Sequence, residues 1–180
     1  MKKANKVFIA TSLDGYIADN DGGIDWLHSV PNPDGLDLGY LSFMTDIDAI
    51  VMGRNTFETV CGFDIEWPYK VPVFVLSNSM KEVAPKYRLY AQIVTGSLRT
   101  VVNEIHQMGY YQLYIDGGST ITGFLKADMI DEMTITTIPI LLGTGIPLFS
   151  NIDQRLKFKC ICTDILLDTM VQSTFIRDQY

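Results

Sequence analysis

The sequence predicts a single α/β domain over residues 1–180, in which a mostly parallel sheet ends in antiparallel strands. Two features of the chain predict this class. Up to Glu132, short apolar runs alternate with segments whose apolar residues follow helical spacing, as in chains that form parallel sheets. After Glu132, strand-like runs follow one another without helices between them, which is typical of antiparallel pairing. The chain is long enough for one domain to bury a continuous core.

Eight runs rich in apolar and β-branched residues are expected to be strands. The uninterrupted apolar character of most of them is typical of strands that are covered on both faces. Their ranges are Lys6–Ser12, Ala49–Met52, Val71–Leu76, Gln92–Thr95, Gln112–Ile115, Met133–Ile138, Phe158–Ile165 and Met170–Arg177.

Four segments are expected to form helices, placed on both faces of the sheet. The first has apolar residues at helical spacing, and the third starts at a serine N-cap and ends before a glycine C-cap. The expected helices are Asp34–Thr45, a short helix that contains Phe57 and Val60, Ser97 to about Met108, and Ser119–Ala127.

The composition argues against several classes of function. The net charge is −7, whereas nucleic-acid binders carry clustered lysine and arginine, so we expect no nucleic-acid partner. No apolar run approaches the ~20 residues that cross a bilayer, and the basic N-terminus lacks the long apolar stretch of a signal peptide. We therefore expect a cytoplasmic protein without a membrane partner.

The cysteines and histidines predict no metal site. Cys160 and Cys162 lie in one predicted strand, where they would share a face and be too close for a relaxed disulfide. Cys61 is distant in sequence, and the chain has only two histidines. The three cysteines are expected to be reduced and structural.

Polar turns follow three predicted strands, after Met52, Leu76 and Ile115, at the edge of the sheet where ligands bind in α/β proteins. After Met52, the segment Gly53-Arg54-Asn55-Thr56 combines a sharp turn, free amides at a helix start, a guanidinium and a hydroxyl. Amides and arginine both favour an anion, so this segment reads either as a phosphate cradle or as a plain connection with an exposed arginine.

The segment Asp116-Gly117-Gly118-Ser119-Thr120 has the same character at a second strand end. Paired glycines permit close approach of the backbone to a ligand, and the hydroxyls of Ser119 and Thr120 can cap a helix or bind a phosphate. A glycine-rich turn needed only for packing is the alternative.

Four segments, in this order, resemble one superfamily: Ser12-Leu13-Asp14-Gly15-Tyr16-Ile17-Ala18, Met52-Gly53-Arg54-Asn55-Thr56-Phe57-Glu58, Asp116-Gly117-Gly118, and residues 139–149 (PILLGTGIPLF). The superfamily comprises dihydrofolate reductase and the reductase domain of bifunctional riboflavin-biosynthesis proteins. The first and last segments are more similar to the riboflavin branch. The resemblance implies a dihydrofolate-reductase-like fold of three layers. It also implies an oxidoreductase.

The resemblance implies that the cofactor is NADPH, bound by four parts of the chain. Backbone groups of Ala10 and Thr11 would lie against the nicotinamide. Ser77, Asn78 and Ser79 would face the adenosine end. The phosphates would be held by Gly53, Arg54, Asn55 and Thr56, and the pyrophosphate by Gly117, Gly118, Ser119 and Thr120.

Two carboxylates are candidates for the functional acid. In dihydrofolate reductases an acid on the helix before the Met-Gly-Arg turn binds the pterin and assists its protonation. An ungapped count back from Gly53 places Asp37 there, in a partly buried position, although a solvated residue in a first helical turn is the alternative. In riboflavin-type reductases an acid before the paired glycines binds the pyrimidine, and Asp116 occupies that place. Trp26 is a candidate to stack on a planar substrate, or else packs in the core.

The sequence therefore predicts a reductase that transfers a hydride from NADPH to a small molecule, either dihydrofolate or 5-amino-6-(5-phosphoribosylamino)uracil. A reductase of an unrelated C=N or C=O compound and a nucleotide-binding module without turnover remain open. A homodimer is also expected, because the C-terminal half carries more apolar residues than one hairpin needs. These residues are Ile138, Ile140, Leu141, Leu142, Ile146, Leu148 and Phe149.

Overall fold

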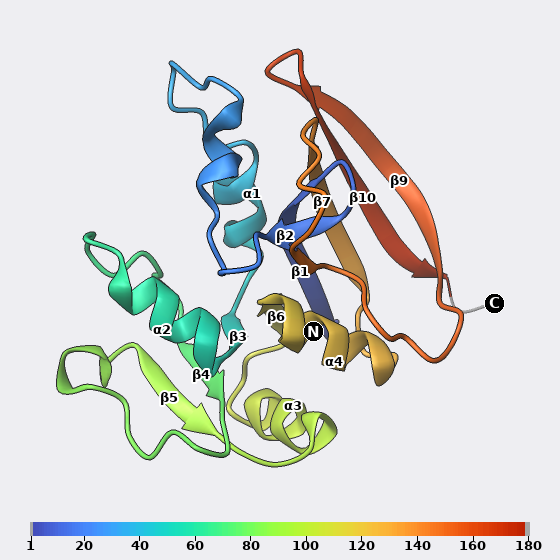
Figure 1. Cartoon of the computed structure of the whole chain (residues 1–180). Helices are drawn as coiled ribbons and strands as arrows, with labels where there is room; N and C mark the ends of the chain where they lie inside the picture. Colours follow the sequence, from blue (N-terminus) through green and yellow to red (C-terminus); the bar gives the residue numbers. More distant parts are fainter. Residues whose placement is uncertain (1, 179–180) are drawn as a thin grey trace.

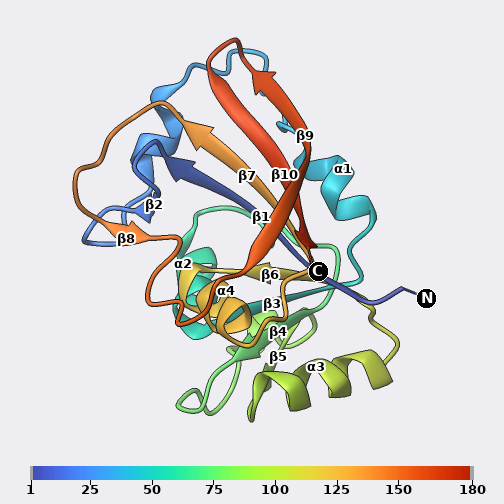
Figure 2. The same ribbon diagram turned by 90° about the vertical axis from the view of Figure 1, so that its right-hand side faces the viewer.

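The computed structural model describes residues 2–178, and a twisted sheet runs through it (Figures 1 and 2). Its eight strands are β1 (Ala4–Ser12), β3 (Ala49–Gly53), β4 (Val73–Leu76), β5 (Ala91–Val94), β6 (Gln112–Asp116), β7 (Glu132–Ile138), β9 (Lys157–Leu166) and β10 (Met170–Asp178). The spatial order is β5-β4-β3-β6-β1-β7-β10-β9. The first six of these are parallel, β10 is antiparallel to β7, and β9 is antiparallel to β10. The predicted mixed sheet is confirmed.

Helices cover both faces, as the sequence predicts. They are α1 (Tyr40–Thr45), α2 (Arg54–Gly62), α3 (Leu98–Gln107) and α4 (Gly118–Lys126), with short 3-10 turns η1 (Asp25–Ser29) and η2 (Pro85–Tyr87). A separate small ribbon joins β2 (Tyr16–Ala18) to β8 (Ile146–Pro147). No helix among residues 2–178 is long and apolar enough to cross a bilayer.

The two faces of the sheet build two apolar clusters. On one face, Val101 and Ile105 of α3 and Phe124 of α4 are buried against strand residues such as Val51 and Ile115. On the other face, α1 and α2 cover a second cluster, whose members include Phe43, Phe57, Ile50, Met52 and Tyr114. Ala49–Met52 is fully buried on both faces, which explains why that strand is apolar at every position.

The first predicted helix is wrong at its start. Helix α1 begins at Tyr40, not at Asp34. Gly35, Leu38 and Gly39 have φ of 60°, 55° and 88°, so the chain turns through left-handed conformations that a right-handed helix excludes. The apolar spacing that predicted the longer helix continues across this turn.

The expected geometry of the two C-terminal cysteines is also wrong. The β9–β10 pairing shifts register between Thr174 and Phe175, so that Cys160 lies opposite Phe175 and Cys162 opposite Thr174. This bulge adds a residue to β9 and places the two thiols on opposite faces of the strand. All three cysteines are free thiols.

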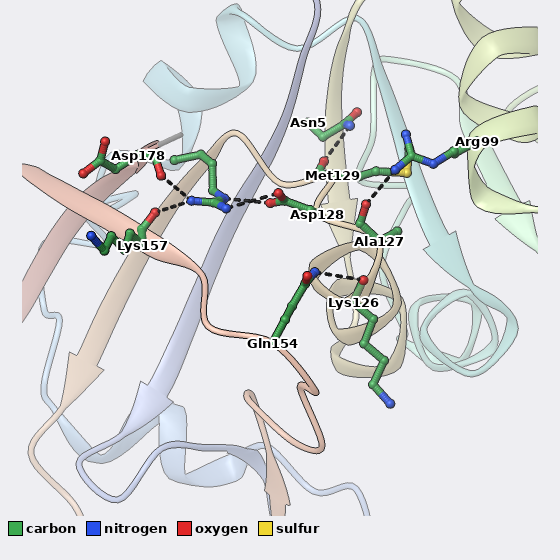
Figure 3. A network of polar contacts seen from close by, with 10 residues as sticks. Asn5, Arg99, Lys126, Ala127, Asp128, Met129, Gln154, Lys157 and Asp178 are labelled. Atoms are coloured by element: carbon green, nitrogen blue, oxygen red, sulfur yellow. Dashed lines mark hydrogen bonds and ion pairs between the residues drawn. The ribbon is translucent and has the colours of Figure 1, made fainter. Parts of the chain in front are cut away.

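The C-terminal end of α4 is tied to its surroundings by side chains (Figure 3). Gln154 donates to the carbonyl of Lys126 at 3.2 Å, and Arg99 donates to the carbonyl of Ala127 at 3.0 Å. Arg177 of β10 binds both carboxylate oxygens of Asp128, at 2.7 and 3.1 Å. The bonds from Gln154 and Arg99 satisfy orphan carbonyls at the end of α4, and the ion pair of Arg177 with Asp128 ties that end to β10. At the N-terminal end of α4, by contrast, no side chain caps the helix.

Candidate functional site

A cleft of about 950 Å³ lies at the carboxyl ends of β3 and β6. Two strand-to-helix turns form one side of the cleft, and the segment from Ile17 to Ile24 forms another. Because β3 and β6 are parallel neighbours, the turns that follow them lie next to each other. This is the edge of an α/β sheet where ligands bind.

The turn from β3 into α2 presents Gly53, Arg54, Asn55 and Thr56 to the cleft. No side chain caps the N-terminus of α2, so its first amides are free to bind an anion. Arg54 donates to Ser79 Oγ at 3.1 Å and lies 3.8 Å from a carboxylate oxygen of Glu58. The ion pair is half exposed and therefore weak, which leaves the guanidinium available to a ligand.

The turn from β6 into α4 touches the first turn. Gly117 has a φ of 86°, and a Cβ at this position would collide with Thr56 Oγ1. In the reverse direction, a Cβ at Gly53 would lie 3.1 Å from Thr120 Oγ1. The N-terminus of α4 has no side-chain cap either. The N-termini of α2 and α4 are thus uncapped and adjacent, and the close approach of Gly117 to Thr56 requires glycine. The positive ends of both helix dipoles therefore lie at the same part of the cleft.

Asp116, the last residue of β6, lies in the cleft beside these amides. Burial raises the pKa of its carboxyl group, although the Tyr114 hydroxyl and the Gly117 amide, which donates to Oδ1 at 2.9 Å, act in the opposite direction. Three phenols lie close enough to interact electrostatically with this carboxyl group. Burial and the charge of Asp116 raise the pKa of Tyr40 to about 12 and also raise the pKa of Tyr69 and of Tyr114. A carboxyl group of raised pKa can bind the polar edge of a substrate ring, and in its acid form it can donate a proton to the substrate.

The cleft contains many of the residues that the sequence singled out. They are Gly53, Arg54, Asn55, Thr56, Asp116, Gly117, Gly118, Ser119 and Thr120. The structure therefore brings together the two turns that the sequence predicted to share an edge. Their roles toward a cofactor stay predictions.

Two other predicted parts of the cofactor site lie next to the cleft. Ser79 is joined to the cleft by the hydrogen bond that its hydroxyl accepts from Arg54. Ser77 Oγ accepts the amide hydrogens of Ser79 and Met80 at 3.3 and 2.9 Å, which fixes the turn after β4. Asn78 is exposed in the same turn. At the end of β1, the side chain of Thr11 is buried and lines a separate cavity of about 240 Å³, and Ala10 is half-buried. The backbone role predicted for Ala10 and Thr11 stays a prediction.

Asp37 and Trp26 do not lie among the residues that line the cleft. Asp37 is exposed in the loop before α1, and its carboxylate accepts the Leu41 amide hydrogen at 2.7 Å. The expected partly buried position on a helix is therefore wrong, and this carboxylate instead stabilises the start of α1. Trp26 lies in η1, where its indole Nε1 is buried without a hydrogen-bond partner among the described residues.

Several cleft residues were not predicted from the sequence. Tyr69 comes from the irregular segment before β4, and Asn20, Asp21 and Gly22 come from the loop after β2. No periodicity identifies such residues. Tyr114 does not line the cleft: it precedes Asp116 by two residues on β6, is buried in the core and donates its hydroxyl to the Phe8 carbonyl at 3.0 Å.

Comparison with known proteins gives relatives over almost the whole chain. A "Putative riboflavin biosynthesis protein" from Shewanella sp. PV-4 is 52% identical, with a TM-score of 0.95 and coverage of 98% of this chain and 99% of that chain. Protein YwjB of Bacillus subtilis (strain 168), described as uncharacterized, is 32% identical over 161 residues, which are 88% of this chain and 90% of YwjB.

A more distant likeness concerns the fold. Dihydrofolate reductase from Enterococcus faecalis, solved in complex with NADP(H) and RAB-propyl, is 16% identical, with a TM-score of 0.68 and coverage of 98% of this chain and 97% of that chain. The predicted dihydrofolate-reductase-like fold is thus confirmed. Residues 6–166 match the family model described as the RibD C-terminal domain. This match covers the cleft and every strand of the sheet except β10, and the chain belongs to the RibD C-terminal domain family.

Proposed function

We propose that the protein is an NADPH-dependent reductase that transfers a hydride to a substrate of the pyrimidine or pterin type. The observation that carries the proposal is the meeting of two uncapped helix N-termini, one arginine and one half-buried carboxyl group in a single cleft. The helix ends and Arg54 suit the phosphates of a dinucleotide. Asp116 suits the polar edge of a ring. Membership of the RibD C-terminal domain family supports a reductase of this type.

The residues of the cleft fit NADPH. Gly117 lies against Thr56 with no side chain between them, and neither α2 nor α4 has a side-chain cap, so the first amides of both helices are available to a pyrophosphate. Gly53–Thr56 and Gly117–Thr120 would hold the phosphates, with Arg54 and Ser79 near the 2′-phosphate. When bound, the cofactor supplies the hydride.

The chain's own contribution to the reaction is positioning and proton control. The carboxyl group of Asp116 would bind the ring beside the nicotinamide site and keep it aligned. Because its pKa is raised, this group can also deliver a proton to a ring or imine nitrogen as the neighbouring carbon is reduced.

The direct test follows the loss of NADPH absorbance with each of two substrates, dihydrofolate and 5-amino-6-(5-phosphoribosylamino)uracil. We expect turnover with one of them, and the pyrimidine is favoured because Asp116 lies in the cleft and Asp37 outside it. NADPH binding without oxidation in the presence of either ring would favour a nucleotide-binding module. Oxidation only with an unrelated C=N or C=O compound would favour the other alternative.

We expect the protein to prefer NADPH to NADH by about tenfold or more, because Arg54 and Ser79 can bind a 2′-phosphate. Charge-assisted hydrogen bonds contribute on the order of 1.5–3 kcal/mol each, and the half-exposed position of Arg54 reduces that value. Calorimetry on Arg54→Gln should show weaker NADPH binding and nearly unchanged NADH binding. Arg99→Gln, which removes a guanidinium on α3, is the control. Equal dissociation constants of the wild-type protein for the two cofactors would contradict the assignment.

We also propose a homodimer formed through the β7–β10–β9 part of the sheet. Ile138 and Leu148 are buried in the monomer, but Leu141 and Phe149 are 67% and 49% exposed. Edge strand β9 adds Ile165, which is 70% exposed. Exposed apolar groups of this kind usually mark an interface. Sedimentation equilibrium at micromolar concentration should give twice the mass of one chain, whereas the mass of a single chain would contradict the proposal.

A further inference from the structure

Tyr69 is an aromatic residue that lines the cleft together with Asp116 and lies outside the four segments by which the sequence resembles the reductase superfamily. It belongs to Trp67-Pro68-Tyr69, the segment that leads into β4, and it lines the same cleft as Asp116 and Gly117. The segment has no regular secondary structure. The side chain is nevertheless held in place by packing against Trp67.

The ring of Tyr69 is fixed by an aromatic cluster behind the cleft. It packs edge-on against Trp67, with ring centroids 5.4 Å apart and an interplanar angle of 82°. Trp67 stacks on Tyr90 at 5.8 Å and meets Phe57 of α2 edge-on at 5.9 Å. Packing of this kind restricts the rotamer of Tyr69, so its hydroxyl is preorganised.

The hydroxyl of Tyr69 is a hydrogen-bond donor in a cleft that also holds an acceptor, Asp116. Burial and, after it, the charge of Asp116 raise the pKa of Tyr69, so the phenol keeps its proton. Asp116 offers carboxyl oxygens, one of which already accepts the Gly117 amide hydrogen at 2.9 Å. A phenol O–H and a carboxyl oxygen that line one cleft complement a ring edge that presents a carbonyl next to an N–H, since either protonation state of the carboxyl group has an oxygen that accepts.

We propose that Tyr69 is a substrate-positioning residue whose hydroxyl acts together with Asp116 to select a planar ring with a cyclic-amide edge. The ring carbonyl accepts the hydrogen bond of Tyr69, and the adjacent ring N–H donates to Asp116. The inference rests on the proposed function and deepens it, because it names the chemical feature by which the cleft recognises its substrate. Rings whose amide nitrogen is methylated lose the contact with Asp116 and are rejected.

The test measures ring binding separately from turnover. The full chain is titrated by calorimetry with 5,6-diaminouracil and with 5,6-diamino-1,3-dimethyluracil, which lacks the amide N–H groups. Wild-type protein should bind the first probe more tightly than the second. Tyr69→Phe should weaken the first probe by about tenfold, the loss expected for one hydrogen bond, and should leave NADPH affinity unchanged.

Tyr87→Phe is the matched control, because Tyr87 belongs to the same aromatic cluster but donates its hydroxyl to the Cys61 carbonyl outside the cleft. Equal effects of the two variants on the first probe would overturn the role of Tyr69. Equal wild-type affinity for the two probes, or no binding of either, would overturn the selection of a cyclic amide. Failure of the proposed function is distinct, since it appears as absence of NADPH oxidation by the wild-type protein even where the probes bind as expected.

Discussion

Gly117→Ala is expected to weaken NADPH binding by at least about 100-fold. A side chain at this position is strained because φ is 86°, and its Cβ collides with Thr56 Oγ1. Relief of the collision moves the α4 turn away from the α2 turn, so that the two sets of amides no longer converge on one anion. Loss of two charge-assisted hydrogen bonds is enough for a change of this size. Calorimetric titration with NADPH measures it.

Gly62→Ala is the control for this substitution. Gly62 ends α2, and a Cβ there meets no atom within 4 Å. This variant should bind NADPH as the wild-type protein does. If Gly117→Ala also kept the wild-type affinity while remaining folded, the cofactor would bind elsewhere and the assignment of the two turns would be wrong.

Asp116→Asn should lower turnover of the pyrimidine substrate by at least ~100-fold, the lower end for loss of a general acid or base. The amide keeps the shape of the carboxyl group but removes its charge and its acidic proton. NADPH affinity should change little, because other groups hold the cofactor. Steady-state kinetics on Asp116→Asn and Asp37→Asn provide the comparison. Since Asp37 is exposed and bound to the Leu41 amide, its replacement should change turnover only about twofold.

The pH dependence of turnover gives a second measure of the same residue. Burial raises the pKa of Asp116, so its acid form persists to higher pH than that of an exposed aspartic acid. If the acid form delivers the proton, kcat falls as pH rises through this pKa. The fall should be absent from the residual activity of Asp116→Asn. A larger loss in Asp37→Asn than in Asp116→Asn would restore the folate-type assignment of the acid.

Much of the fold could be predicted because its determinants are local in sequence. The central strands are buried on both faces, so they appear as uninterrupted apolar runs such as Ala49–Met52. The ligand-facing turns were predictable because glycine follows two parallel strands directly. That β3 and β6 are neighbours was not predicted, but a common sheet edge was enough to place Gly53 and Gly117 together.

The remaining site residues depend on contacts that no local pattern encodes. The acid at Asp37 was predicted by an ungapped count through a segment that contains a left-handed turn at Leu38 and Gly39. The spacing of apolar residues gives no sign of such a turn, because the turn depends on the backbone dihedral angles of Leu38 and Gly39 and not on which side chains are apolar. Tyr69 enters the cleft from an irregular segment, and its position is fixed only by packing against Trp67.

Isotope transfer tests the central claim, hydride transfer in this cleft, most directly. The wild-type protein is incubated with the pyrimidine substrate and NADPH that carries deuterium on one or the other face of nicotinamide C4. One of the two isotopomers should place deuterium on the reduced carbon of the product, because the cleft fixes one face of the nicotinamide toward the reacting carbon of the substrate. Product without deuterium from either isotopomer, or no product although both ligands bind, would contradict the account.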